Sequence, residues 1–244
     1  MNGENRTLVV FARRPVAGQV KTRLATSIGP AAAADLYLAF LRDTLRIATL
    51  VPVERCIACS PADEATQHWF TTLADQRLTV WPQPAGELGE RLAACFEKFL
   101  DHPGDRLVVI GSDAPTLPHR LIEQAFDTLD AYDAVIGPAM DGGYYLIGAR
   151  QTGQGAAALF NEIDWDGPSV LEQTVTRLRE SRYSLGLLPP WYDVDTLEDL
   201  QALHGHLAAL EYAGDFATAP CTRQALHLLQ TDMIPNAVVS KEPS

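Results

Sequence analysis

The chain has 244 residues, 47% of them hydrophobic and 20% charged, a composition that fits a globular protein with one sizeable core. Its net charge of −12 argues against binding to nucleic acid or to an anionic membrane, because both need a broad basic surface. A small anionic ligand is still compatible, since a local basic cluster or a bound cation can outweigh the overall sign. With no signal-peptide pattern and no bilayer-spanning apolar run, we expect a cytoplasmic protein of unspecified oligomeric state.

Strand-like and helix-like segments alternate along most of the chain. Short apolar runs rich in β-branched residues predict strands, in chain order, at 7–12, 54–60, 78–81, 106–111, 134–138, 144–148 and 184–188. Apolar residues at helical spacing predict helices at 31–50, from 61 onward, and at 88–100, 118–129, 169–182 and 196–210. This alternation predicts an α/β fold, a three-layer αβα sandwich around a mostly parallel sheet, with room for one antiparallel strand after Gly137.

The chain shows no linker that would divide it. We therefore expect a single domain over residues 1–212 and a partly frayed C-terminal extension over 213–244. Cys56 and Cys59 form a C-x-x-C pair inside a predicted strand, where residues three apart face opposite sides of the sheet. Because no second pair follows to complete a zinc site, buried structural thiols are the favoured interpretation.

Three helix starts carry capping signals. Ser60, followed by proline, is expected to cap the helix that opens after the second strand. Ser169 with Glu172, and Thr196 with Asp199, have the spacing of capping boxes.

A basic loop follows the first predicted strand. Residues 13–23 hold four of the chain's 19 Lys and Arg residues, together with Gly18. Backbone N–H groups of such a loop and cationic side chains suit a diphosphate. The spacing is neither that of a Walker A loop nor that of a G-x-G-x-x-G turn, so a solvated basic loop is the alternative.

Aspartates follow two further predicted strands. Asp113 ends the most apolar strand, where a carboxylate can face a ligand and hold Mg²⁺ or Mn²⁺ against phosphate oxygens. A turn-forming aspartate before proline is the alternative for this position. Asp193 and Asp195 follow the last predicted strand, and either could complete the metal site or favour the next helix through its dipole. The run 141–145 contains two glycines that permit close backbone approach to a ligand, or a simple turn.

Five ordered motifs resemble a family of bacterial proteins with the nucleotide-diphospho-sugar transferase (GT-A) fold. The family was long classed as a domain of unknown function and is often labelled a glycosyltransferase associated with radical-SAM and with selenium or arsenosugar clusters. The resemblance covers about residues 7–210, and it is carried by 11–24 (FARRPVAGQVKTRL), 86–91 (GELGER), 111–115 (GSDAP), 137–148 (GPAMDGGYYLIG) and 193–196 (DVDT).

The resemblance implies roles for the motif residues. The first loop, the 86–91 motif and the end of the apolar strand would bind the nucleotide, through Arg13, Pro15, Gly18, Lys21, Arg23, Gly86, Leu88, Gly89, Arg91 and Ser112. The metal, Mg²⁺ or Mn²⁺, would be held by Asp113 and Asp195 or Asp193. The sugar or acceptor side would be lined by Gly142, Gly143, Tyr144 and Trp165. The implied catalytic residues are Asp113, Asp141 and Lys21.

One segment departs from the family pattern. The family carries Trp, a small residue and Thr before the helix that is expected here at Ser169, and this chain has Trp165 without the Thr. The acceptor, or the loop that would contact it, is therefore expected to differ.

Two transferase reactions fit this scaffold, and both neutralise charge at phosphate. The favoured function is metal-dependent transfer of a sugar from a nucleotide-diphosphate donor to a small-molecule acceptor. The alternative is nucleotidyl transfer from a nucleoside triphosphate to a small phosphorylated substrate, because Pro15, Gly18 and residues 21–24 also resemble phospholactate guanylyltransferases. A non-catalytic nucleotide-binding protein is the third hypothesis.

Overall fold

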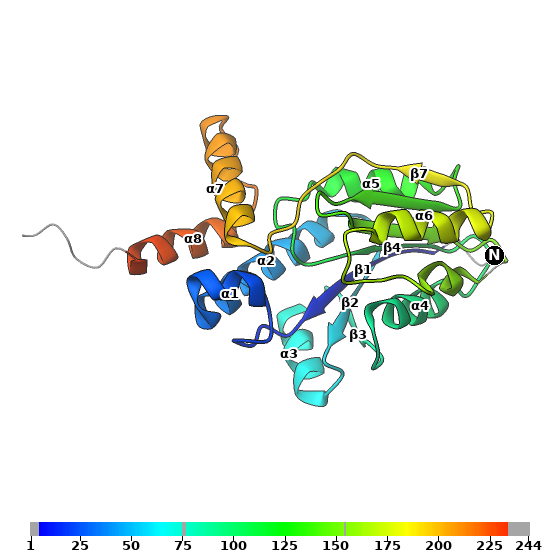
Figure 1. Ribbon diagram of the computed structural model, residues 1–244, viewed down its shortest axis with the longest axis horizontal. Coiled ribbons are helices and arrows are strands. Elements are labelled where there is room, and N and C mark those ends of the chain that lie inside the picture. The colour runs from blue at the N-terminus through cyan, green and yellow to red at the C-terminus, as the bar shows by residue number, and fades with distance from the viewer. Residues whose placement is uncertain (1–4, 75–76, 154, 234–244) are drawn as a thin grey trace, which may run out of the picture. The chain divides into compact units, whose positions relative to one another are not determined.

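The computed structural model describes residues 5–74, 77–153 and 155–233. Seven strands form one sheet in the order β3-β2-β1-β4-β6-β5-β7 (Figure 1). Their bounds are β1 Arg6–Arg13, β2 Glu54–Ser60, β3 Thr79–Pro82, β4 Arg106–Ile110, β5 Ala134–Pro138, β6 Tyr144–Arg150 and β7 Leu185–Leu187. Strand β6 runs antiparallel to both of its neighbours, β4 and β5, and every other pairing is parallel. The mostly parallel sheet and its antiparallel strand after Gly137 are confirmed.

The helices are α1 Thr22–Ile28, α2 Pro30–Leu50, α3 Glu64–Ala74, α4 Leu88–Phe99, α5 His119–Thr128, α6 Val170–Glu180, α7 Leu197–Tyr212 and α8 Pro220–Met233, with the 3₁₀ helix η1 at Ala156–Phe160. None of the described helices combines the length and the hydropathy that crossing a bilayer requires.

The chain clusters into two compact units. The first comprises residues 1–14 and 44–194, and the second comprises 15–43 and 195–244, so that the division falls inside α2. The first unit holds the whole sheet, and the second is helical. The expectation of one domain over 1–212 stays a prediction.

The core of the first unit lies on both faces of the sheet. On one face, α4, η1 and α6 bury Cys95, Phe96, Phe160 and Leu178 against alternate strand residues such as Val109. On the other face, α5 contacts β4 and β5 (Figure 1). The alternation follows from strand geometry, since successive side chains point to opposite faces. This arrangement confirms the three-layer αβα sandwich.

Several local predictions need correction. The helix after β2 begins at Glu64, and Asp63 accepts the Thr66 N–H at 2.8 Å, so Asp63 rather than Ser60 supplies the cap. Ser169 makes no side-chain capping bond, because its hydroxyl accepts a hydrogen bond from the Gln173 amide instead.

Other local expectations hold. The capping box of Thr196 and Asp199 is present at the start of α7. Cys56 and Cys59 are buried in β2, as expected of structural thiols. Three elements lie where no helix was predicted, namely α1, η1 and α8. The extension expected over 213–244 therefore contains α8, while residues 234–244 lie outside the described residues.

In the second unit, one buried carboxylate of α2 accepts hydrogen bonds from the first turn of α8. Asp43, which is 1% exposed, accepts hydrogen bonds from the Cys221 N–H at 3.1 Å and from the Thr222 N–H and hydroxyl at 2.7 Å. These N–H groups belong to the first turn of α8, which has no intrahelical acceptors for them. The carboxylate therefore supplies from α2 the cap that α8 lacks in its own sequence.

We predict that Asp43→Ala lowers the free energy of unfolding by about 2 kcal/mol, because it leaves two helix-terminal N–H groups and one hydroxyl without an acceptor. Urea unfolding followed by circular dichroism measures the change. The matched control is Asp35→Ala, an exposed aspartate of the same helix, which should shift the free energy by less than about 0.5 kcal/mol. Equal effects of the two variants would contradict the capping role.

Candidate active site

The sheet topology marks one edge of the first unit as the place for a ligand. The strand order reverses between β1 and β4, which pair in parallel. Ligands of open α/β sheets bind outside the carboxyl ends of the strands at such a reversal. Arg13 lies at the carboxyl end of β1, and Ser112 and Asp113 follow the carboxyl end of β4. The structure therefore brings these three predicted site residues to one edge, with Ser112 buried and Asp113 half-buried.

The segment after β7 crosses this edge. The Trp191 N–H donates to the Pro138 carbonyl at 3.0 Å, and the Val194 N–H donates to the Asp113 carbonyl at 3.1 Å. The chain thus passes from the end of β5 to the end of β4. Asp193, which is half-buried, stands one residue before the contact with Asp113. Backbone hydrogen bonds therefore tie the segment that carries Asp193 to the loop that carries Asp113.

The 86–91 motif builds the start of α4 and places Arg91 at the same edge. Glu87 and Glu90 form a capping box there. A Cβ on Gly89 would lie 2.5 Å from the Trp165 indole nitrogen and 2.7 Å from the Phe160 carbonyl. Gly89 is thus required by the packing of α4 on η1, and Leu88 packs on the same core. Gly86 adopts a φ of +126°, a conformation that glycine allows.

Arg91 is held by a residue that the sequence analysis did not single out. Its Nη1 donates to the side-chain oxygen of Gln83 at 2.9 Å. Gln83 is 3% exposed and directly follows β3; its amide nitrogen donates to the Ala58 carbonyl, and its backbone N–H donates to the Cys59 carbonyl at 2.9 Å. A polar residue directly after a predicted strand was the signal that could have found it.

Two charged side chains, those of Arg13 and Glu87, act on Arg91 in opposite directions. Burial, and then the neighbouring guanidinium of Arg13, lower the pKa of Arg91, while Glu87 opposes this shift. The only side-chain hydrogen bonds of Arg91 are those to Gln83 and to the Glu87 carbonyl, and no ion pair forms between Arg91 and a carboxylate of the described residues. Two guanidinium groups therefore influence each other at the carboxyl ends of the strands.

The DGGYY motif is mainly a packing element. Asp141 is exposed, and its Oδ1 accepts the Gly143 N–H at 2.9 Å. A Cβ on Gly142, whose φ is +95°, would lie 2.0 Å from the Pro168 carbonyl oxygen. The Tyr144 ring meets the Trp165 ring edge-on at 6.4 Å, and both pack against the core. Tyr144 and Trp165, predicted on the acceptor side, thus serve the packing of the first unit, and their predicted role is untested.

The cations of the predicted phosphate loop fall into different units. Arg13 belongs to the first unit, whereas Lys21 and Arg23 belong to the second. Lys21 Nζ lies 2.6 Å from Asp195 Oδ1, and Arg23 bonds the other carboxylate oxygen. The Lys21 side chain is only 4% exposed. Both cations therefore pair with one carboxylate of their own unit.

The remaining loop residues shape this arrangement. Pro15 is half-buried, and Gly18, with a φ of +79°, lies in a turn closed by the Gln19 N–H and the Val16 carbonyl at 2.9 Å. Lys21 itself has a left-handed φ of 48° at the N-terminus of α1.

Burial raises the pKa of Asp195, but the opposing effects of Lys21 and Arg23 are together larger, so that the pKa lies below its ordinary value. The carboxylate is thus ionised at neutral pH and committed to two cations. Its predicted role as a metal ligand stays a prediction. Within the described part of the chain, no group of three or more His, Cys, Asp or Glu side chains is placed to hold a metal ion.

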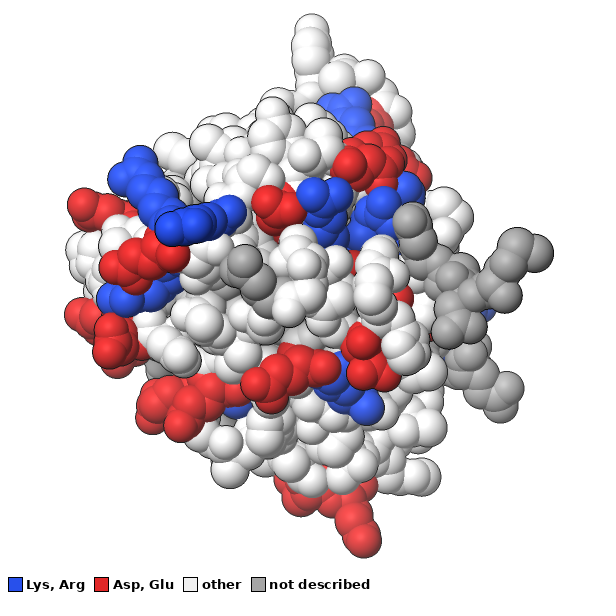
Figure 2. Space-filling view, turned by 90° about the vertical axis from the view of Figure 1, so that its right-hand side faces the viewer, with Lys and Arg blue, Asp and Glu red and all other residues white. Residues whose placement is uncertain are grey.

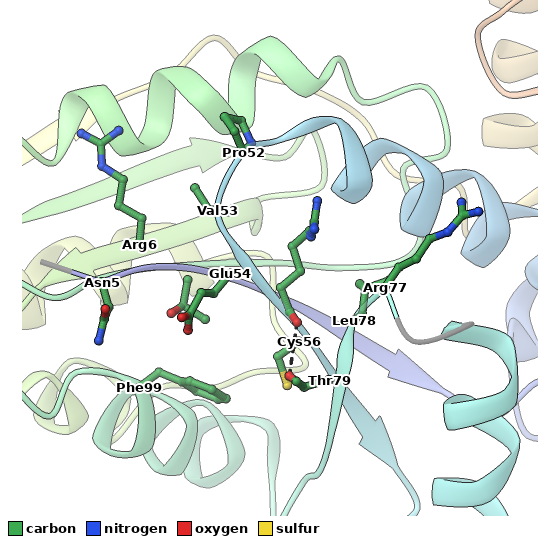
Figure 3. Close-up of a pocket in the computed structure, with 12 residues that line it drawn as sticks. Asn5, Arg6, Pro52, Val53, Glu54, Cys56, Arg77, Leu78, Thr79 and Phe99 are labelled. Carbon is green, nitrogen blue, oxygen red and sulfur yellow. Dashed lines mark hydrogen bonds between the residues drawn. The ribbon is translucent and has the colours of Figure 1, made fainter. Parts of the chain in front are cut away.

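A pocket of about 830 Å³ opens at the opposite end of the sheet, beside the amino ends of β1, β2 and β3 (Figure 3). Arg6, which lines it, turns toward α5 and pairs with Asp130 at 3.2 Å and Asp127 at 3.8 Å. Arg55 donates to the Thr49 carbonyl at 3.1 Å, at the end of α2. Acidic and basic side chains are mixed over the surface at the amino end of β1 (Figure 2). This pocket lies away from the carboxyl ends of the strands, and it is not the candidate site.

Comparison with known proteins gives a family and a fold for this chain. The family model for uncharacterised proteins conserved in bacteria, DUF2064, matches residues 44–167. A crystal structure from Desulfovibrio desulfuricans G20, described as a candidate nucleotide-diphospho-sugar transferase, is 33% identical, with a TM-score of 0.83 and coverage of 94% of this chain and 98% of that one. No curated protein matches the sequence.

More distant structures share the fold alone. A 4-diphosphocytidyl-2C-methyl-D-erythritol synthase is 13% identical, with a TM-score of 0.57 over 85% of this chain and 100% of that one. A cytidylyltransferase from Leptospira borgpetersenii serovar Hardjo-bovis is 11% identical, with a TM-score of 0.54 over 98% of this chain and 100% of that one. The sheet and these similarities define a nucleotide-diphospho-sugar transferase (GT-A) fold. Within that class, the chain belongs to the bacterial DUF2064 family.

We predict that Asp195→Asn destabilises the protein by about 2 kcal/mol at pH 7, because it removes the carboxylate that lies 2.6 Å from the buried Lys21 ammonium. The folded-state pKa of Asp195 is depressed, so the pair stabilises the wild type above the unfolded pKa of about 4, and this stabilisation is lost as pH falls through the folded pKa. Urea unfolding at a series of pH values from 7 down to 2.5 should show the difference between wild type and variant shrinking at the acid end.

Glu211→Gln is the control for this prediction. Glu211 is 60% exposed and lies 3.5 Å from Arg223, so its loss should change stability by less than about 0.5 kcal/mol at every pH. A difference between wild type and Asp195→Asn that does not change with pH would contradict the assignment.

Proposed function

We propose that this protein is a metal-dependent glycosyltransferase that moves a sugar from a nucleotide-diphosphate donor to a small-molecule acceptor. The donor's phosphates bind at the carboxyl ends of the strands of the first unit. Two facts support the class, namely the family membership and the 33% identical structure described as a candidate nucleotide-diphospho-sugar transferase.

The observation that carries the proposal is the environment of Arg91, which makes no ion pair with a carboxylate of the described residues. A half-buried guanidinium beside a second one, without a carboxylate in ion-pair contact, is costly unless an anion binds. A protein with a net charge of −12 has ample carboxylates for neutralising such a site, as it does at Lys21 and Arg23. Arg13 and Arg91 are therefore the anion-binding groups of the first unit, and a diphosphate is the ligand that the fold class offers them.

Asp113 and Asp193 are the residues of the first unit that would hold Mg²⁺ or Mn²⁺. Their oxygens suit a hard cation, and two carboxylates are enough where phosphate oxygens and water complete the shell, as is usual for Mg²⁺. The bound metal would neutralise charge on the departing diphosphate. Asp195 belongs to the second unit, and its participation stays a prediction from the sequence.

In the proposed reaction the bond between the anomeric carbon and the diphosphate breaks, and a bond from the acceptor's oxygen to that carbon forms. Arg13 and Arg91 stabilise the negative charge of the leaving diphosphate. Asp141 is exposed, uses one oxygen for the Gly143 N–H, and is the candidate to take the acceptor's proton. Lys21, the other predicted catalytic residue, would need to exchange Asp195 for a phosphate before it could act.

Nucleotidyl transfer is the second candidate, because the fold is shared with cytidylyltransferases. In that reaction a phosphorylated substrate would displace pyrophosphate from a nucleoside triphosphate. The same arginines and aspartates would serve the phosphates. The products separate the two functions, since sugar transfer releases a nucleoside diphosphate and nucleotidyl transfer releases pyrophosphate.

We predict that a sugar nucleotide raises the melting temperature of the protein in the presence of Mn²⁺. The panel contains UDP-, GDP- and dTDP-sugars, their nucleoside diphosphates, GTP and CTP, each with Mn²⁺ and with EDTA. A ligand at a hundredfold excess over its Kd stabilises the fold by about 2.7 kcal/mol, which a thermal shift resolves. A shift with triphosphates alone would replace sugar transfer by nucleotidyl transfer, and no shift with any ligand would contradict both.

We predict that Asp113→Asn abolishes the Mn²⁺-dependent part of this shift, since the neutral amide binds a divalent cation far more weakly than a carboxylate. Asp101→Asn, which removes an exposed carboxylate of the same unit, should leave the shift unchanged. The same nucleotide panel measures both variants, with the unliganded melting temperature as the check on folding. An unaltered metal-dependent shift in Asp113→Asn would exclude Asp113 as a ligand.

A further inference from the structure

Gln83 is a buried residue that contacts the Arg91 guanidinium. Its side chain is buried between two fixed partners, the Ala58 carbonyl, which accepts from the amide nitrogen, and the guanidinium of Arg91, which donates to the amide oxygen. The guanidinium has only donors and the carbonyl is only an acceptor, so the orientation of the amide is dictated by its partners. The backbone N–H of Gln83 is itself held by the Cys59 carbonyl at 2.9 Å.

The side chain that contacts Arg91 is a neutral amide, and its effect on the charge of Arg91 differs from that of a carboxylate. A glutamate or aspartate in contact with Arg91 would orient the guanidinium equally well, but would neutralise its charge. The neutral amide of Gln83 accepts from one N–H of Arg91 and leaves the charge of the guanidinium in place. Among the described residues, Nη2 of Arg91 has no hydrogen-bond acceptor. Arg91 is thus fixed in position but still electrostatically available to an anion.

We propose that Gln83 is a positioning residue that acts through Arg91, holding its guanidinium ready for the phosphates of the nucleotide. This inference rests on the proposed function, because it assumes that the arginine pair binds a nucleotide's phosphates. Ordering an arginine side chain costs conformational entropy. Because Gln83 already orders Arg91 in the free protein, less entropy is lost when the ligand binds.

The test is a double-mutant cycle on ligand affinity. Gln83→Leu, Arg91→Met and the double variant are titrated with inorganic pyrophosphate and with UDP and GDP, each with Mn²⁺, by isothermal titration calorimetry. Gln83→Leu should raise the Kd about tenfold in the wild-type background, the order expected for losing a preorganised contact. In the Arg91→Met background, the same change should leave the Kd unaltered, because the residue through which Gln83 acts is gone.

A structural role would give a different pattern. If Gln83 only stabilised the fold through Ala58, its loss would change the Kd by the same factor in both backgrounds, or in neither, and either result would overturn the proposal. Gln83→Met, with an unbranched chain of similar length, is the second variant in case leucine does not fit. Gln67→Leu is the control, since Gln67 also donates to a backbone carbonyl, that of Ala62 at 2.9 Å, but on the exposed surface of α3.

The titrations distinguish a failure of the proposed role of Gln83 from a failure of the proposed function. Wild-type protein that binds neither pyrophosphate nor a nucleotide contradicts the proposed function. Wild-type protein that binds with an affinity insensitive to Gln83→Leu and Gln83→Met contradicts only the role of Gln83.

Discussion

The parallel pairing of β1 with both β2 and β4 is the constraint on which the candidate site depends. Because β1 is central and its neighbours run in the same direction, the residues that follow these strands emerge at one edge. Arg13 and Asp113, a hundred positions apart in the sequence, reach that edge for this reason alone. The antiparallel β6 sends its chain the other way, and the segment after β7 crosses this edge through hydrogen bonds to the Pro138 and Asp113 carbonyls.

The distribution of ion pairs separates structural from functional cations. Lys21 and Arg23 share Asp195, and Arg6 pairs with Asp127 and Asp130. Arg91 instead donates a hydrogen bond to the neutral amide of Gln83. In a chain with twelve more acidic than basic side chains, a half-buried guanidinium beside a second one, with no carboxylate of the described residues in ion-pair contact, favours an anionic ligand. Lys21 and Arg23 of the glycine-bearing loop, which the sequence favours as the phosphate site, instead share one carboxylate.

Several motif residues owe their identity to packing. Because Gly89 has no Cβ, the Trp165 indole and the Phe160 carbonyl can pack against it. The Pro168 carbonyl packs against Gly142 for the same reason. Tyr144 and Trp165 meet edge to face in the core. These contacts place α4, η1 and the DGGYY loop against one another, and so they position Arg91 and Asp141. A motif shared across a family can therefore combine residues that bind with residues that only hold the binding groups in place.

The sequence by itself determined the strands, most of the helices and the three-layer class, because apolar periodicity records which face of each element is buried. It also determined that Arg13 and Asp113 follow strands, and it predicted the capping box of Thr196 and Asp199, since both depend on neighbours within a few positions. Only the tertiary structure decided how the charges pair. Lys21 and Asp195 are 174 positions apart, and no local pattern specifies a contact over that separation. The same holds for Gln83, whose importance lies in touching Ala58 and Arg91, residues brought together by strand pairing and by the docking of α4.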